Sequence, residues 1–186
     1  MAKRYGVLSA IRLLKKYSTD RKSFIAVFKH SRTVLKVAFT LLSKSKNKKD
    51  FDKEFIKTAC MIHDIGRFKH KVIKGKPELS IQHGLEGAKI LKKEGWPKKY
   101  QDVCENHLGI GIRKQDIIKQ KLNLPKKDFV PKTKEEMLIT YADNLVKGSG
   151  IVDENDVVKR YTMYFGKEYG ERVKIFHKKI HEMLEK

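Results

Sequence analysis

Cys60-Met61-Ile62-His63-Asp64-Ile65-Gly66-Arg67 places a histidine and an aspartate side by side, where an apolar run ends at a glycine. Before this pair, Phe55, Ala59 and Ile62 recur at helical spacing, and Asp50 is a suitable N-cap residue. The pattern predicts a helix whose last turn carries His63 on its inward face. Inward-facing polar residues of other helices are therefore the candidates to meet this pair.

The composition indicates one folded domain with a strongly basic surface. The chain has 186 residues, of which 40% are hydrophobic and 35% charged, and this length is enough to bury one sizeable core. Lysine and arginine number 43 against 22 aspartates and glutamates. The formal net charge of +21 favours anionic partners such as nucleotides, nucleic acid or an acidic membrane surface. We expect a single domain over residues 1–186.

The sequence predicts a cytoplasmic protein without a membrane partner. No apolar run approaches the roughly 20 residues that a membrane-spanning helix needs, and the N-terminal segment is not that of a signal peptide. Cys60 and Cys104 are far apart and neither belongs to a Cys-x-x-Cys pair. A disulfide framework or a thiolate zinc site is therefore not expected. The oligomeric state stays open.

Helical periodicity recurs along the chain, and no segment sustains the period-two alternation of strands. The predicted fold class is therefore all-α. A basic loop is expected at residues 43–49, and a second one from Ile65 to Leu79. The helices are expected at about residues 5–17, 20–42, 50–63, 80–94, 98–108, 114–122, 133–146, 153–165 and 168–184.

Several expected helices carry a histidine or an aspartate on the inward face or at one end. Asp143 lies in the most apolar stretch of the chain, where an ionised carboxylate needs a cation nearby. A lysine, an arginine or a metal ion would supply it, and inward histidines are groups that a metal would use. The candidate metal ligands are His30, His63, Asp64, His83, His107 and Asp143.

Six ligands are too many for one ion once water is included, and they suit two divalent ions with Asp64 as a bridge. Imidazole and carboxylate ligands suit iron, manganese, zinc, cobalt or nickel better than calcium. One or two divalent transition-metal ions are therefore the expected cofactor. The pattern does not choose among these five metals.

The order His30, His63-Asp64, Asp143, with the run His63-Asp64-Ile65-Gly66, resembles the HD-domain superfamily of metal-dependent phosphohydrolases, and within it the HDIG group. The stretches around His83, His107 and Asp143 resemble uncharacterised archaeal members of that group. The similarity covers about residues 24–147. It implies a helical bundle around a central metal site, with an N-terminal helix and two C-terminal helices packed on this core.

The resemblance also implies roles for these residues. His30, His63, Asp64 and Asp143 would bind a first ion, and His83 with His107 would hold a second one bridged by Asp64. The implied reaction is hydrolysis of a nucleotide or a related phosphoester or phosphoanhydride, in which a metal-activated hydroxide attacks phosphorus. Asp64 and Arg67 are the expected catalytic residues. Independently of the resemblance, proximity to the pair makes Arg67 and Lys69 the expected contacts to a phosphate, with plain surface charge as the alternative for Lys69.

Other functions stay open. The positive charge also suits a non-catalytic module that binds nucleotides or RNA, although no basic stripe is interleaved with aromatic residues as in single-strand binders. A third hypothesis is a di-iron centre that activates dioxygen, as in some proteins whose fold resembles that of HD domains. The chain lacks the Gly-Tyr-Pro triplet that marks cyclic di-GMP phosphodiesterases of the superfamily. His177 and His181 are left out of the site, because no pattern places a carboxylate beside them.

Overall fold

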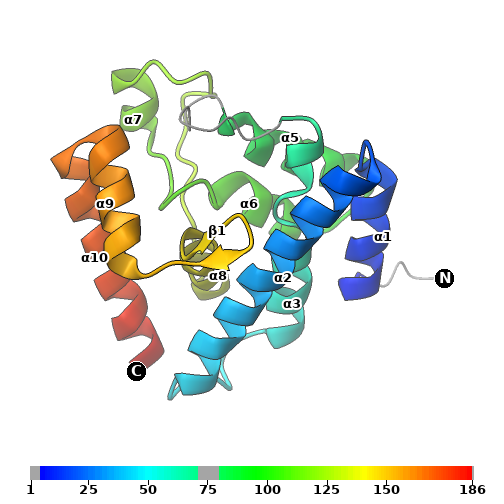
Figure 1. Cartoon of the computed structure of the whole chain (residues 1–186), viewed down its shortest axis with the longest axis horizontal. Helices are drawn as coiled ribbons and strands as arrows, with labels where there is room; N and C mark the ends of the chain where they lie inside the picture. The colour runs from blue at the N-terminus through cyan, green and yellow to red at the C-terminus, as the bar shows by residue number, and fades with distance from the viewer. Residues whose placement is uncertain (1–4, 71–79, 186) are drawn as a thin grey trace.

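The computed structural model describes residues 5–70 and 80–185, and it confirms the all-α prediction apart from one short hairpin (Figure 1). Part of the loop expected from Ile65 to Leu79 therefore lies outside the described residues, and its first part is a 3-10 helix. The elements are α1 (Val7–Tyr17), α2 (Arg21–Lys44), α3 (Lys53–Ile62), η1 (Ile65–Phe68), α5 (Gln82–Lys93), α6 (Lys98–Asn106), α7 (Lys114–Lys119), α8 (Lys134–Asn144), β1 (Val146–Lys147), β2 (Gly150–Ile151), α9 (Glu154–Phe165) and α10 (Lys167–Glu185).

Helix α8 lies near the centre of the molecule, between α2 and α3 on one side and α10 on the other (Figure 1). Leu138, Ile139 and Ala142 of α8 are fully buried in the main hydrophobic cluster, to which all of these helices contribute. Helix α5 packs on α6 and on η1. Within the described ranges, no helix has the length and apolar character that crossing a bilayer requires.

The starts of two helices differ from the prediction. Asp52, and not Asp50, is the N-cap of α3, because its side chain is the one that accepts a hydrogen bond from the backbone N–H of Phe55 (2.9 Å). Helix α5 begins at Gln82, with Ile81 as its N-cap residue and no side-chain N-cap bond, whereas the sequence predicted a start at about residue 80. Neither shift alters which residues of the two helices face inward.

The segment after α8 forms a hairpin that the sequence did not predict. Strand β1 pairs antiparallel with β2, and Val146 lies opposite Ile151. Gly148 in the turn has a φ of 64°, a conformation that favours glycine. Each strand has only two residues, which is too short for period-two alternation to be recognised. The expected end of this helix at Val146 moves back to Asn144.

Glycines bring η1, α5 and α6 into backbone contact. A Cβ atom on Gly66 would lie 1.9 Å from the carbonyl oxygen of His83 and 2.6 Å from the backbone nitrogen of Gly87. A Cβ atom on Gly84 would lie 2.8 Å from the carbonyl oxygen of Cys104. These distances leave no room for a side chain, so glycine is needed at both positions for the backbones to approach this closely.

Candidate metal centre

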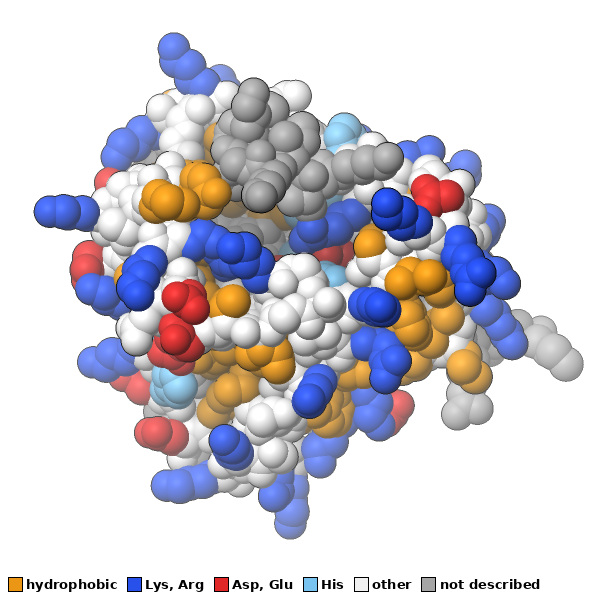
Figure 2. All heavy atoms as spheres, in the orientation of Figure 1, with side chains coloured by type: hydrophobic (Ala, Val, Ile, Leu, Met, Phe, Trp, Pro, Cys, Tyr) orange, Lys and Arg blue, Asp and Glu red, His pale blue; other side chains and the backbone are white. Residues whose placement is uncertain are grey.

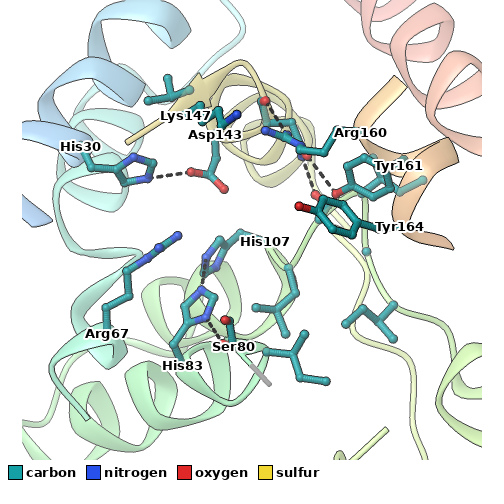
Figure 3. A pocket seen from close by; sticks show the side chains of 18 of the residues that line it. His30, Arg67, Ser80, His83, His107, Asp143, Lys147, Arg160, Tyr161 and Tyr164 are labelled. Atoms are coloured by element: carbon teal, nitrogen blue, oxygen red, sulfur yellow. Dashed lines mark hydrogen bonds and ion pairs between the residues drawn. The ribbon is translucent and has the colours of Figure 1, made fainter. Parts of the chain in front are cut away.

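Four buried histidines, His30, His63, His83 and His107, meet at one place, and Figure 3 shows three of them, His30, His83 and His107. Each ring holds its Nδ1 against a backbone carbonyl oxygen, which only accepts, so Nδ1 carries the proton of the neutral ring. The pairs are His30 with Gly148 (2.7 Å), His63 with Cys60 (2.8 Å), His83 with Ser80 (2.5 Å) and His107 with Cys104 (2.8 Å). The Nε2 lone pairs are left for the centre, as in histidines that bind a metal.

The ends of several helices position these side chains. His63 is the C-cap residue of α3 and Asp64 follows it directly, while His107 is the C-cap residue of α6. His83 lies in the first turn of α5 and Asp143 in the last turn of α8. His30 comes from the middle of α2. All six ligands predicted from the sequence are therefore brought together.

The first group of ligands consists of His30, His63, Asp64 and Asp143. Oδ1 of Asp143 lies 2.8 Å from Nε2 of His30 and 3.4 Å from Nε2 of His63. Oδ2 of Asp64 lies 3.2 Å and 3.6 Å from the same two nitrogens. Two imidazoles and two carboxylates thus face one another, which is a donor set for a divalent transition metal.

The second group consists of Asp64, His83 and His107. Oδ1 of Asp64 lies 3.3 Å from Nε2 of His83 and 3.4 Å from Nε2 of His107. Asp64 therefore belongs to both groups and turns one carboxylate oxygen toward each. The two sets are adjacent because they share this one side chain.

Buried polar atoms without partners mark the same place. Among the described residues, both carboxylate oxygens of Asp64 and Nε2 of His63 are fully buried and have no hydrogen bond of adequate geometry, although Oδ2 of Asp64 forms an ion pair with Arg67. A buried carboxylate without such bonds is strongly disfavoured unless a cation is close to it. These donors and their orientation fit divalent metal ions.

The acidic and basic groups of the centre shift the pKa values of one another. Burial acts to lower the pKa of His30, but the carboxylates of Asp143 and Asp64 outweigh it and raise the pKa to about 10, so a metal ion bound there would replace the proton on Nε2. Burial acts to raise the pKa of Asp64, but the charges of Arg67 and His63 hold it well below its usual range. His83 has a lowered pKa because burial outweighs the nearby carboxylate. The imidazoles of His30 and His63 likewise hold the pKa of Asp143 low despite its burial, so both aspartates of the centre are ionised.

Arg67 extends from η1 toward the centre (Figure 3). Its Nε forms an ion pair with Oδ2 of Asp64, and its side chain also lines the cavity described below. Arg67 therefore has two roles. Its positive charge faces the cavity, as expected from the sequence, and it also holds the Asp64 carboxylate in place, which the sequence did not indicate. Lys69 is exposed and does not line this cavity, so the structure gives no support to its predicted phosphate contact.

A cavity of about 740 Å³ opens beside the six ligands. His30, His83, His107 and Asp143 line one end of it. Sequence reasoning missed residues on the other walls of the cavity. Lys147 of the hairpin and Arg160, Tyr161 and Tyr164 of α9 line it (Figure 3), as do Phe165, Ile110 and Ile112. The α9 residues recur at helical spacing, which predicted the helix but not that one of its faces lines this cavity.

Asn144 joins the metal ligands to this wall. It directly follows Asp143 and accepts a hydrogen bond from the hydroxyl of Tyr161 at Oδ1 (2.9 Å). Its backbone carbonyl accepts one from Nη2 of Arg160 (3.0 Å). These bonds fix α9 against the end of α8, so that Tyr161 and Arg160 stay at the cavity.

The pair left out of the site does have a carboxylate neighbour. Nε2 of His181 lies 2.6 Å from Oε1 of Glu154, and Nδ1 of His177 lies 3.5 Å from Oε2. Tyr141 donates its hydroxyl to the same glutamate. The compact ligand groups among the described residues are the two that share Asp64, and these residues belong to neither. They form a polar network between α8, α9 and α10.

Known proteins share both the sequence pattern and the fold. The sequence model of the HD domain family matches residues 27–148. The uncharacterized protein MJ0778 of Methanocaldococcus jannaschii is 34% identical over 161 residues, which are 85% of this chain and 89% of that protein. A tRNA (cytidine(56)-2'-O)-methyltransferase of Picrophilus torridus is 31% identical over 154 residues, or 83% of this chain. The chain spans 41% of the length of that methyltransferase.

A solved structure has a similar arrangement of helices. The HD domain of the L. monocytogenes phosphodiesterase PgpH, in complex with cyclic-di-AMP, matches with a TM-score of 0.53 at 17% sequence identity. The match covers 95% of this chain and 95% of the other. At this level of identity the likeness concerns the fold.

Proposed function

Because the chain belongs to the HD domain family, we propose that it is a metal-dependent phosphohydrolase that acts on a nucleotide or a related phosphoester or phosphoanhydride. The observation that carries the proposal is the position of Asp64, whose two oxygens face two different groups of ligands. Such a carboxylate is suited to bridge two divalent ions. We assign the first ion to His30, His63, Asp64 and Asp143, and the second to Asp64, His83 and His107.

Divalent ions in these positions would lower the pKa of water and offset the charge that builds on the phosphoryl oxygens. The chain itself supplies the orientation of the donors. The four Nδ1–H groups bond to backbone carbonyls, so the rings keep their Nε2 atoms directed at the centre without further ordering. Arg67 holds Asp64 in place through its ion pair.

Cations on the cavity walls are placed to meet a phosphate. Lys147 of β1 and Arg160 of α9 line the cavity on the side of Asp143. Lys147 is exposed, and Arg160 has further N–H groups besides the one that bonds to Asn144. Both offer charge-assisted hydrogen bonds to phosphate oxygens. We assign them to substrate binding, and Asp64 to catalysis.

The size and lining of the cavity favour a small phosphorylated molecule that carries a ring. A volume of about 740 Å³ lies in the range of small-molecule sites. Tyr161, Tyr164 and Phe165 line the wall away from the ligands, and aromatic side chains bind bases by stacking. The solved structure of similar fold is a complex with a nucleotide, cyclic-di-AMP, which supports this substrate class.

Metal analysis joined to a substrate panel tests the proposal. Protein purified without chelator is expected to contain about two transition-metal ions per chain. It is expected to hydrolyse at least one member of a panel of nucleotides, dinucleoside polyphosphates and cyclic phosphodiesters. A metal content near zero would overturn the enzyme assignment. Bound metal without any turnover would instead favour a binding module.

Replacement of Asp64 tests the site itself. Asp64→Ala is expected to abolish turnover, because both ligand groups lose a member. His181→Ala is the matched control, since His181 is a half-exposed histidine outside both groups. Wild-type activity in the Asp64 variant would refute the assignment.

A further inference from the structure

We propose that the exposed basic face of α2 binds the phosphate backbone of a nucleic-acid strand, at a site separate from the metal centre. Helix α2 has 24 residues and contains no aspartate or glutamate. Lys29, Arg32 and Lys36 are three and four residues apart, so they lie along one face of the helix. Lys22, one heptad before Lys29, extends the same row.

The positive charge of the protein is concentrated around this helix. Residues 1–49 contain 14 lysines and arginines and a single acidic residue, Asp20. The remaining 137 residues carry 29 basic and 21 acidic side chains, a net charge of +8 against +13 in the first 49 residues. The net charge is therefore not spread evenly, and the field of the molecule is strongest over α1, α2 and the loop that follows them.

The basic residues of this face lack the acidic partners that some lysines have elsewhere. Among the described residues, no carboxylate forms an ion pair with Lys29, Arg32 or Lys36; the Arg32 guanidinium lies over the ring of Phe28 at 5.8 Å. On other helices several lysines pair within one turn, as Lys57 does with Glu54 (2.7 Å) and Lys89 with Glu86 (2.7 Å). Unpaired like charges repel one another, and a row of phosphates would offset that repulsion.

The face is hollowed where it meets the hairpin. Lys29, Arg32 and Lys36 line a groove together with Thr33, Leu35 and Ser149. The hydroxyl of Thr33 bonds to the carbonyl oxygen of Ser149 (3.3 Å), which ties the turn to α2. Figure 2 shows Lys and Arg side chains over the part of the surface where α2 lies. The groove thus offers several cations along one direction, as an extended polyanion requires.

The hairpin turn separates this groove from the cavity at the metal centre. Ser149 lines the groove, whereas the preceding Gly148 and Lys147 line the cavity. The carbonyl oxygen of Gly148 accepts a hydrogen bond from His30, the neighbour of Lys29 in α2. A strand bound in the groove would therefore pass next to the mouth of the cavity. The proposal concerns binding alone and does not depend on hydrolysis.

Fluorescence anisotropy with a labelled single-stranded RNA of about 20 nucleotides tests the proposal. The variant carries Lys29→Glu, Arg32→Glu and Lys36→Glu, all exposed and outside the core. The matched control carries Lys174→Glu, Lys178→Glu and Lys179→Glu on α10, which change the net charge equally. We expect the α2 variant to lose at least about 30-fold in affinity and the control less than about threefold. The log-log salt slope should fall by about two units in the α2 variant, about 0.7 for each lost phosphate contact.

Further binding measurements identify which chemical group of the ligand the α2 face binds. Single-stranded DNA of the same sequence should show the same loss, because the phosphate backbone is common to both strands. An equal loss in the α2 and α10 variants, or no RNA binding by the wild type, would overturn the proposal. So would α2-dependent binding to phosphatidylserine vesicles without binding to RNA. Hydrolysis of mononucleotides is measured in parallel, since its loss would concern the metal centre and not this groove.

Discussion

The Nε2 atoms of His83 and His107 lie 3.1 Å apart, while both rings hold their Nδ1 on backbone carbonyls. Two neutral rings in this tautomer direct two lone pairs at each other. Both side chains are buried, so water does not relieve the repulsion. A proton on His107, whose pKa Asp64 raises despite burial, would relieve it, and so would the metal ion that we propose between the two rings and Oδ1 of Asp64.

Removal of one of these histidines should separate the two ligand groups. His107→Ala is expected to lower the metal content from about two ions per chain to about one, because the first group keeps all its members. Turnover should fall at least about 100-fold. Loss of a residue that only hydrogen-bonds to a metal ligand typically lowers activity by at most about 100-fold. Metal content is measured by plasma emission spectroscopy on dialysed protein, with His181→Ala as control. An unchanged metal content would show that His107 is a core residue.

The close packing around Gly66 predicts how strongly a side chain at this position would lower the stability of the protein. A Cβ atom there would lie 1.9 Å from the carbonyl oxygen of His83, which is backbone and cannot rotate away. Gly66→Ala should therefore lower the free energy of unfolding by about 3 kcal/mol, through overpacking between η1 and α5. Urea unfolding measures the change. Gly150→Ala is the control, since its nearest neighbour would lie at an ordinary 3.6 Å; similar losses in both variants would argue against a special role of Gly66.

Lys147 tests the assignment of the cavity wall to phosphate binding. It is exposed on β1 and lines the cavity, so its loss should leave the fold intact. Lys147→Ala is expected to lower kcat/KM about tenfold, as for the loss of one charge-assisted hydrogen bond of about 1.4 kcal/mol. Lys147→Arg should recover most of this, because the positive charge is retained. Steady-state kinetics on the best panel substrate provide the comparison, and unchanged kinetics in the alanine variant would exclude the contact.

The six candidate ligands, which the structure brings together, could be selected from the sequence because most of them have a local signature. His30, His63 and His107 interrupt apolar stripes, and Asp143 lies in the most apolar stretch of the chain, so each signal needs only a short window. The all-α class followed from the same periodicity. The N-cap of α3 was misplaced because two aspartates are both suited to it, and only the position relative to the N–H of Phe55 decides.

Features that depend on distant pairing were not predictable. Arg160 and Tyr161 reach the cavity because α9 is bonded to Asn144, and helical periodicity indicates a buried face but not its neighbour. Glu154 meets His181 across 27 positions in the chain, so no local pattern joined them. The hairpin escaped detection because its strands are two residues long. Long-range geometry determines the first two of these features, whereas the hairpin is local and was missed because its strands are short.

An ion pair between α7 and α10 should make the folding stability of the protein depend on pH in the acidic range. Asp116 accepts hydrogen bonds from Nη1 and Nη2 of Arg172 (2.7 and 2.9 Å) and from the backbone N–H of Arg113 (2.9 Å). Burial acts to raise the pKa of Asp116, but these bonds, with one from Tyr169, lower it from 3.8 to about 2. The Asp116 carboxylate therefore binds a proton less readily in the folded state than in the unfolded state. The resulting stabilisation is complete above about pH 4 and is lost as the pH falls toward 2.

Asp116→Asn should reproduce that loss at neutral pH. We expect the variant to be less stable than the wild type by about 1 kcal/mol near pH 6, a value reduced for the partial exposure of the pair. The difference should shrink steadily below about pH 4 and be small at about pH 2, where about half of the wild-type Asp116 carboxyls are protonated in the folded state. Urea unfolding at several pH values measures it, with the exposed Asp50→Asn as control. A difference that stays constant with pH would mean that the carboxylate charge does not stabilise the contact between α7 and α10.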